Sequence, residues 1–220
     1  MNKNLPSLVA NAIADILGAF QIPGASTLGM LSGAAIEELL AKRVENARKI
    51  IIEELAHARR PLEDVHERDE IVAIVYRYLD AARQGAARLN LRLLAKVASG
   101  QVEREEIRAD VFLRHAEMLS SLAREEVIFL ATLHRHFAQA HARDNIAVYR
   151  EVEEAIVAAV GCERGEVKAI AAALQRTGML MPIHPHLVGG AGYYVEPSQA
   201  LCRVIALASF EDALRDEAKG

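Results

Sequence analysis

The chain has 220 residues, of which 52% are apolar, 5% aromatic and 25% charged, and its formal net charge is −4. This acidic balance disfavours a broad nucleic-acid-binding surface, because affinity for a phosphate backbone comes largely from Lys and Arg. The two cysteines, Cys162 and Cys202, form neither a CxxC pair nor a disulfide framework, so we expect a reducing compartment and two small core residues.

The first residues lack the features of a secretory signal. Lys3 is the only basic residue in the first twenty, and Asn11 and Asp15 interrupt the apolar run that follows it. We therefore expect a cytoplasmic protein.

Composition predicts a mainly α-helical chain, because the apolar residues are mostly Ala, Leu, Ile and Val and only 6 Pro and 13 Gly interrupt them. A short helix is predicted over residues 5–20, followed by a turn at Pro23-Gly24. A long second helix is predicted to begin near Ser26 and to end before a connection at residues 59–70. Its apolar residues recur every three or four positions, as in a helix packed along one face: Ile36, Leu40, Val44, Ala47, Ile51, Leu55 and Ala58.

Three further helices are predicted before residue 144. The third extends from about Val72 to Gly100, where glycine is a natural helix terminator. The fourth and fifth meet at Ser120-Ser121. Amphipathic helices joined by short links bury their apolar faces against one another, so residues 1–143 are predicted to form a bundle of four to five helices.

The charge balance and the predicted secondary structure of the chain change after Asp144. Residues 144–220 carry 7 Lys plus Arg against 11 Asp plus Glu, which leaves 19 of each before them. Two helices over 146–160 and 165–177 are predicted to precede a two-stranded hairpin in MLMPIHPHLVGGAGYYVEPS and a last helix over 199–214. We expect residues 144–220 to form a small α+β module that packs on the bundle.

The run ALQRTGML, the glycine-containing hairpin and the run YYVEPSQALCRVI resemble the second half of a winged-helix module. This resemblance implies a fold, not an activity. The whole layout, including EELLAKRVENARK and FLRHAEMLSSLAREEVIFLATL, resembles uncharacterised bacterial helical proteins found on mobile elements and near phage-defence genes. That second resemblance implies a non-enzymatic effector or sensor role and supplies no catalytic residues.

The longest uncharged stretch separates Asp15 from Glu37 by 21 residues. Pro23 divides it, and the twelve residues from Ala25 to Ile36 make about 18 Å of helix against a bilayer core of about 30 Å, so a simple membrane span is not expected. Two interpretations of residues 5–40 stay open: a tight helical hairpin packed within the bundle, or a hairpin that self-associates or engages a membrane conditionally. In the second, the interaction residues are Phe20, Ile22, Pro23, Gly24, Leu28, Gly29, Met30, Leu31 and Gly33.

A DNA-binding form of the C-terminal module would use Lys168, Gln175 and Arg176 on the solvent face of its second predicted helix. The same face carries Glu166 and three alanines, which make a poor surface for reading bases. A DNA-binding transcriptional regulator is therefore an alternative, and protein contact by this face is the favoured interpretation.

Histidines supply the weak metal candidates. His134 and His141 share one predicted helix face and His115 lies on the helix before it, a pattern compatible with zinc binding or pH sensing. Two ExxH pairs, Glu54 with His57 and Glu63 with His66, and the run His184-Pro185-His186 lack matching partner ligands. Packed core histidines and solvated helix ends explain these residues better, so no metal and no cofactor are expected.

The sequence thus favours a non-enzymatic protein-interaction or effector protein, with a role in phage defence implied by the resemblance. Its apolar N-terminal hairpin would mediate self-association or conditional membrane engagement. The expected partner is a protein or a second copy of the chain, with a membrane surface as a further option, and no small-molecule substrate is identifiable. A metal-binding helical-bundle enzyme is the remaining alternative.

Overall fold

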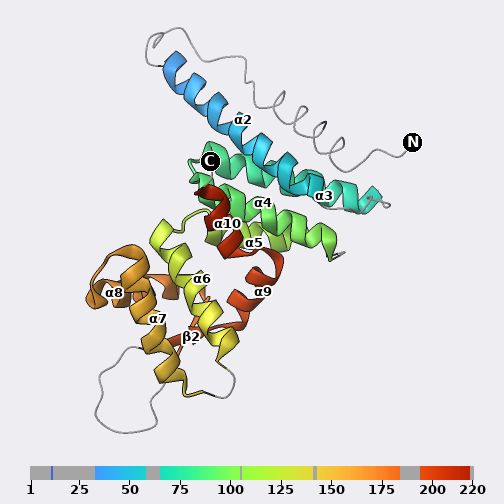
Figure 1. Cartoon of the computed structure of the whole chain (residues 1–220). Helices are drawn as coiled ribbons and strands as arrows, with labels where there is room; N and C mark the ends of the chain where they lie inside the picture. Colours follow the sequence, from blue (N-terminus) through green and yellow to red (C-terminus); the bar gives the residue numbers. More distant parts are fainter. Residues whose placement is uncertain are drawn as a thin grey trace. The chain divides into compact units, whose positions relative to one another are not determined.

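The computed structural model describes residues 11, 33–57, 65–104, 106–140, 143–183 and 194–218. These residues are mainly helical and include one small antiparallel sheet near the C-terminus, as the sequence predicted (Figure 1). They divide into two compact units, Met1–Ser121 and Leu122–Gly220. Within the described ranges, no helix combines the length and the apolar character that crossing a membrane requires.

The first unit is built around one central helix. Nearly all of α4 is buried, and it contacts each of the other three helices described in this unit. A helix that buries residues on nearly all of its faces lies at the centre of its unit, with the other helices packed around it. The fully buried Tyr78 also donates a hydrogen bond of 3.0 Å to the carbonyl of Ala47, which ties α3 to α2. The four helices are α2 (Gly33–His57), α3 (Val65–Arg83), α4 (Arg88–Glu103) and α5 (Ala109–Leu119).

The predicted third helix is in fact two helices, α3 and α4. The chain leaves α3 after Arg83 and turns at Gly85, whose φ of 101° favours glycine. The apolar spacing continues through the turn because both helices bury residues in the same core. Gly100 does not end a helix as predicted, because it is buried inside α4, which continues to Glu103.

The start of α5 is held by residues of two other helices. Arg108 occupies the N-cap position, but its side chain makes no capping hydrogen bond. Instead, Glu70 of α3 accepts a hydrogen bond from the backbone N–H of Ala109, and Gln101 of α4 accepts one of 3.4 Å from the backbone N–H of Arg108. These bonds satisfy donors that the first turn of a helix leaves open.

The second unit is built around α6, which contacts α7, α8, α9, α10 and β2. Its two short strands pair antiparallel, with Met181 opposite Glu196. Gly178, which has a left-handed φ of 67°, precedes the first strand, and its carbonyl accepts a hydrogen bond of 2.7 Å from Ser198. The elements are α6 (Arg124–Gln139), α7 (Asn145–Val160), α8 (Arg164–Leu174), the 3-10 turn η1 (Gln175–Thr177), β1 (Leu180–Pro182), β2 (Val195–Pro197), α9 (Gln199–Leu207) and α10 (Phe210–Glu217).

The boundary between the units differs from the predicted one. We expected a bundle over 1–143 and a module over 144–220, whereas the compact units meet at Ser121–Leu122. The reason is that α6 packs extensively on α7 and contributes fully buried residues such as Phe129 and Leu133 to the second core. Helix α6 therefore belongs with the C-terminal elements.

The predicted last helix is also two helices. α9 ends at Leu207 and α10 begins at Phe210. Ser209 between them accepts a hydrogen bond of 3.2 Å from the backbone N–H of Asp212, which makes it the N-cap of α10.

Candidate interaction surfaces

The predicted N-terminal interaction residues lie almost entirely outside the described part of the chain. Gly33 is the exception, as the first residue of α2. The nearest part of the chain whose side chains the structure describes is Glu38–Val44 of α2, which we call the α2 surface. The predicted residues outside the described ranges are Phe20, Ile22, Pro23, Gly24, Leu28, Gly29, Met30 and Leu31.

The apolar stripe of α2 is covered unevenly. Its second half is buried, with Ala47, Ile51 and Leu55 all at 0% exposure. In the α2 surface, Leu40 and Val44 are only half-buried and Leu39 is 62% exposed. Burying a leucine side chain stabilises a structure by about 1.5–3 kcal/mol relative to leaving it exposed. An exposed Leu39 beside a continuing apolar stripe therefore offers contact area to a partner.

A second exposed apolar patch lies on α3, next to a charged side chain. Val72 and Tyr76, one turn apart, are 39% and 42% exposed. The guanidinium carbon of Arg77 lies 6.0 Å from the centroid of the Tyr76 ring, a cation–π distance. Because the ring already contacts a charged side chain, this patch is the weaker candidate for an apolar partner.

The predicted DNA-contacting residues do not form a free basic surface. Lys168 and Gln175 are exposed, but Arg176 donates hydrogen bonds of 2.6 and 2.8 Å to the two carboxylate oxygens of Glu126. The hydrogen bond from Arg176 is the main reason that the pKa of Glu126 lies below its usual value. A phosphate contact by Arg176 would have to displace this nearly buried carboxylate.

The structure describes only two of the three histidines proposed as metal ligands, and these two lie in different units. His115 is buried on α5 of the first unit, whereas His134 lies on α6 of the second, and His141 falls outside the described residues. Burial is also the main cause that lowers the pKa of His115. Among the described residues, no group of three or more metal-ligating side chains is present. His184, His186 and Glu63 lie outside the described ranges as well.

Glu54, from the first ExxH pair, makes contacts that join two helices. Its carboxylate lies 3.6 Å from the guanidinium of Arg92 and 3.3 Å from the ammonium of Lys96, and its carbonyl accepts a hydrogen bond from Ser99. The three partners are all on α4. Glu54 thus joins α2 to α4 through charged and polar contacts.

The cysteines are both free. Cys162 is half-buried, but Cys202 is exposed on α9, so the expectation that it fills a core was wrong.

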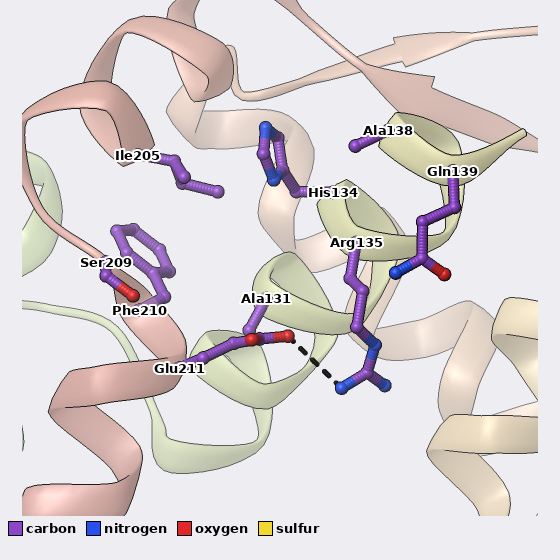
Figure 2. A pocket seen from close by; sticks show the side chains of 9 residues that line it. All are labelled: Ala131, His134, Arg135, Ala138, Gln139, Ile205, Ser209, Phe210 and Glu211. Carbon is purple, nitrogen blue, oxygen red and sulfur yellow. Dashed lines mark hydrogen bonds and ion pairs between the residues drawn. The ribbon is translucent and has the colours of Figure 1, made fainter. Parts of the chain in front are cut away.

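A pocket of about 280 Å³ lies in the second unit between α6, α9 and the start of α10. Figure 2 shows Ile205 reaching across it toward His134, and Arg135 reaching from α6 to Glu211 of α10. Sequence reasoning found His134 alone, from its place on an apolar stripe. The residues that line the pocket are Ala131, His134, Arg135, Ala138, Gln139, Ile205, Ser209, Phe210 and Glu211.

The polar groups of this pocket keep unused hydrogen-bonding capacity. Arg135 and Glu211 form an ion pair of 3.1 Å through Nη1 and Oε1, and both side chains are nearly half exposed. The hydrogen bond between them uses one of the two carboxylate oxygens of Glu211 and one guanidinium nitrogen of Arg135. Burial lowers the pKa of His134, although the Glu211 carboxylate opposes this effect.

No protein-family model, curated protein or solved structure matches this chain. The resemblance to helical proteins of mobile elements and phage-defence regions, with the effector role that it implies, therefore stays a prediction.

Proposed function

We propose that this chain is a protein-interaction protein that self-associates through the α2 surface and the apolar segment that precedes it in the sequence. The observation that carries the proposal is the 62% exposure of Leu39 on a helix whose stripe is buried from Ala47 onward. A partner that covers Leu39, with the half-buried Leu40 and Val44, removes apolar area from water without rearranging the core behind it.

A second copy of the chain is the partner that the sequence favours. Ala25, Gly29 and Gly33 recur every four residues, and small residues at this spacing let two helices approach closely. Glu38 and Lys42 form an exposed ion pair of 2.7 Å on the same turns of α2. Charged residues beside an apolar centre are typical of the rim of a protein–protein interface. Closed homo-oligomers are also the commonest assemblies of soluble proteins.

The α2 surface can be tested with one charge substitution and a matched control. Leu39→Glu places a carboxylate at the exposed position and is expected to shift the assembly toward the monomer. Tyr76→Glu introduces the same charge at an exposed apolar residue of α3 and is expected to leave the mass unchanged. Light scattering coupled to gel filtration, over a series of protein concentrations, measures both.

Three outcomes would contradict this proposal. The first is a wild-type chain that stays monomeric at every concentration, and the second is an assembly that Leu39→Glu leaves intact. The third is a Leu39→Glu chain whose thermal stability falls without any change in mass, which would mean that the chain itself covers Leu39. Dye release from anionic vesicles by a monomeric wild type, abolished by Leu39→Glu, would assign the surface to membranes instead.

For the C-terminal part we propose a winged-helix-like arrangement that contacts protein. The supporting observations are the order α8, β1, β2, α9, the antiparallel pairing of the strands and the hydrogen bond from Ser198 to Gly178. Engagement of Arg176 by Glu126 supports protein contact over DNA binding, because it removes one of three predicted phosphate or base contacts.

A further inference from the structure

The pocket between α6, α9 and α10 combines an apolar wall with one positive and one negative side chain. Ala131, Ala138, Ile205 and Phe210 supply the wall. Arg135 and Glu211 supply the two charges. A concave site with a few convergent polar groups is the usual form of a small-molecule site.

The charges restrict which ligand fits. A simple anion would meet the carboxylate of Glu211, and a simple cation would meet the guanidinium of Arg135. A pure hydrocarbon would displace water from both charged groups and from His134 without replacing its hydrogen bonds, which is unfavourable. The remaining class is a molecule with an apolar body and two opposite charges close together.

The ion pair at the pocket is suited to such a ligand. One nitrogen of Arg135 donates to one oxygen of Glu211, and a guanidinium carries five N–H groups and a carboxylate two oxygens, so the pair can contact a ligand as well as each other. Because both side chains are nearly half exposed, their mutual attraction is weak and is readily exchanged for contacts to a ligand. His134 and the hydroxyl proton of Ser209 add further hydrogen-bonding groups.

The pocket volume of about 280 Å³ is at the lower end of the range of small-molecule sites, so it is matched by a ligand of few heavy atoms. A free aliphatic amino acid has that size, carries one carboxylate and one ammonium, and ends in an apolar side chain.

We propose that this pocket binds a free zwitterionic amino acid with an apolar side chain. Its carboxylate pairs with Arg135, its ammonium pairs with Glu211, and its side chain contacts Ile205 and Phe210. This site lies in the second unit and is separate from the α2 surface, so it adds a ligand to the proposed function and does not depend on self-association.

The test is calorimetric titration of the full-length chain with L-leucine. Saturable binding is expected, and Arg135→Gln and Glu211→Gln are each expected to weaken it severalfold, because each removes one of the two charges that pair with the ligand at a half-exposed site. Ala138→Phe fills the pocket from an exposed position and keeps both charges, and it is expected to abolish binding. Arg143→Gln removes an equally exposed ion pair, with Glu151, elsewhere in the unit and is expected to leave binding unchanged.

Other results would overturn the proposal. Absence of binding by the folded wild type is one, and binding that survives Ala138→Phe, or that Glu211→Gln does not weaken, is another. Equal affinity for N-acetyl-L-leucinamide, which lacks both charges, would show that the pocket takes a peptide segment instead of a free amino acid. Circular dichroism of each variant confirms that a loss of binding is not a loss of fold.

Discussion

The carboxylate of Glu126 connects three parts of the second unit. It receives both hydrogen bonds from Arg176 of η1, and it also accepts one of 2.9 Å from the backbone N–H of Ala123 before α6. Its side chain is 9% exposed, whereas that of Arg176 is 45% exposed. The pair is therefore buried at its acidic end and solvated at its basic end.

Glu126→Gln is expected to destabilise the second unit by about 1–3 kcal/mol, the usual range for removing one partner of a charged hydrogen bond. The value stays below that of a fully buried pair because water can solvate the guanidinium left behind. Urea unfolding measures the change. Glu125→Gln, at the exposed neighbouring position, is the control and is expected to change stability by less than about 0.5 kcal/mol. Equal effects of the two substitutions would mean that the contact with Arg176 does not stabilise the unit.

The same pair predicts a pH dependence. The folded pKa of Glu126 is lowered, chiefly by the hydrogen bond from Arg176, so its stabilisation is complete above the ordinary value of 4.5. That stabilisation is lost as the pH falls through the lower folded pKa. The stability of Glu126→Gln is therefore expected to decline less than that of the wild type below pH 4.5 in acid titrations of the unfolding free energy. Parallel decline of the two chains would argue against it.

Single-residue roles were only partly predictable from the sequence. Periodicity found His134 and Arg176, because each occupies a definite face of a helix. It gave no sign of Glu126 beside Arg176, or of Glu211 beside Arg135, because each pair is 50 or more positions apart and surface charges have many alternative partners.

At the scale of elements, Gly85 and Gly165 differ in whether their position can accept a side chain. Gly85 forms the turn between α3 and α4 with a φ of 101°, and an added Cβ would lie 3.1 Å from the guanidinium of Arg43. Gly165 lies in the first turn of α8, and an added Cβ would meet nothing within 4 Å.

Gly85→Ala is expected to destabilise the first unit by about 1–2 kcal/mol, mainly because of its positive φ, since the end of the Arg43 side chain can move. Gly165→Ala is expected to stabilise the second unit by up to about 1 kcal/mol, because alanine costs less backbone entropy in a helix. Urea unfolding of both variants separates the two effects. A neutral Gly85→Ala would show that the turn can adopt another conformation.

The two helix breaks that the sequence analysis missed differ in whether the sequence marks them. The break at Gly85 is hidden because Leu79, Ala82 and Leu89 keep helical spacing across it while packing into one core. The break before α10 did have a local signal, since Ser209 is followed by Asp212 at the spacing of a helix cap. The antiparallel strands were predictable from the clustered proline, glycine and tyrosine residues around them.

At the scale of the whole chain, the boundary between the units makes a direct prediction. A fragment of residues 122–220 is expected to be helical and to unfold cooperatively, because it retains α6 and the core built on it. A fragment of residues 144–220 is expected to be unfolded, because α7, whose Tyr149, Val152 and Ile156 are buried, loses α6, the helix that it packs on. Circular dichroism during thermal unfolding distinguishes the two. Cooperative unfolding of the shorter fragment would restore the boundary that the sequence suggested.

Composition alone predicted the helical class, because Ala-rich and Leu-rich amphipathic runs have few other ways to bury their apolar faces. It could not assign α6 to a unit. The stripe of α6 is equally apolar whichever neighbours it meets, and only the packing against α7 decides between them.

The start of α5 is capped by side chains of α3 and α4, which has a consequence for the order of folding. A capping side chain within the same segment is available to a helix before its neighbours dock. The first turn of α5 gains its hydrogen-bond acceptors only when Glu70 and Gln101 are already in position, 39 and 7 residues away in the chain. We therefore expect the first turn of α5 to become stable only once α3 and α4 hold these two side chains in position.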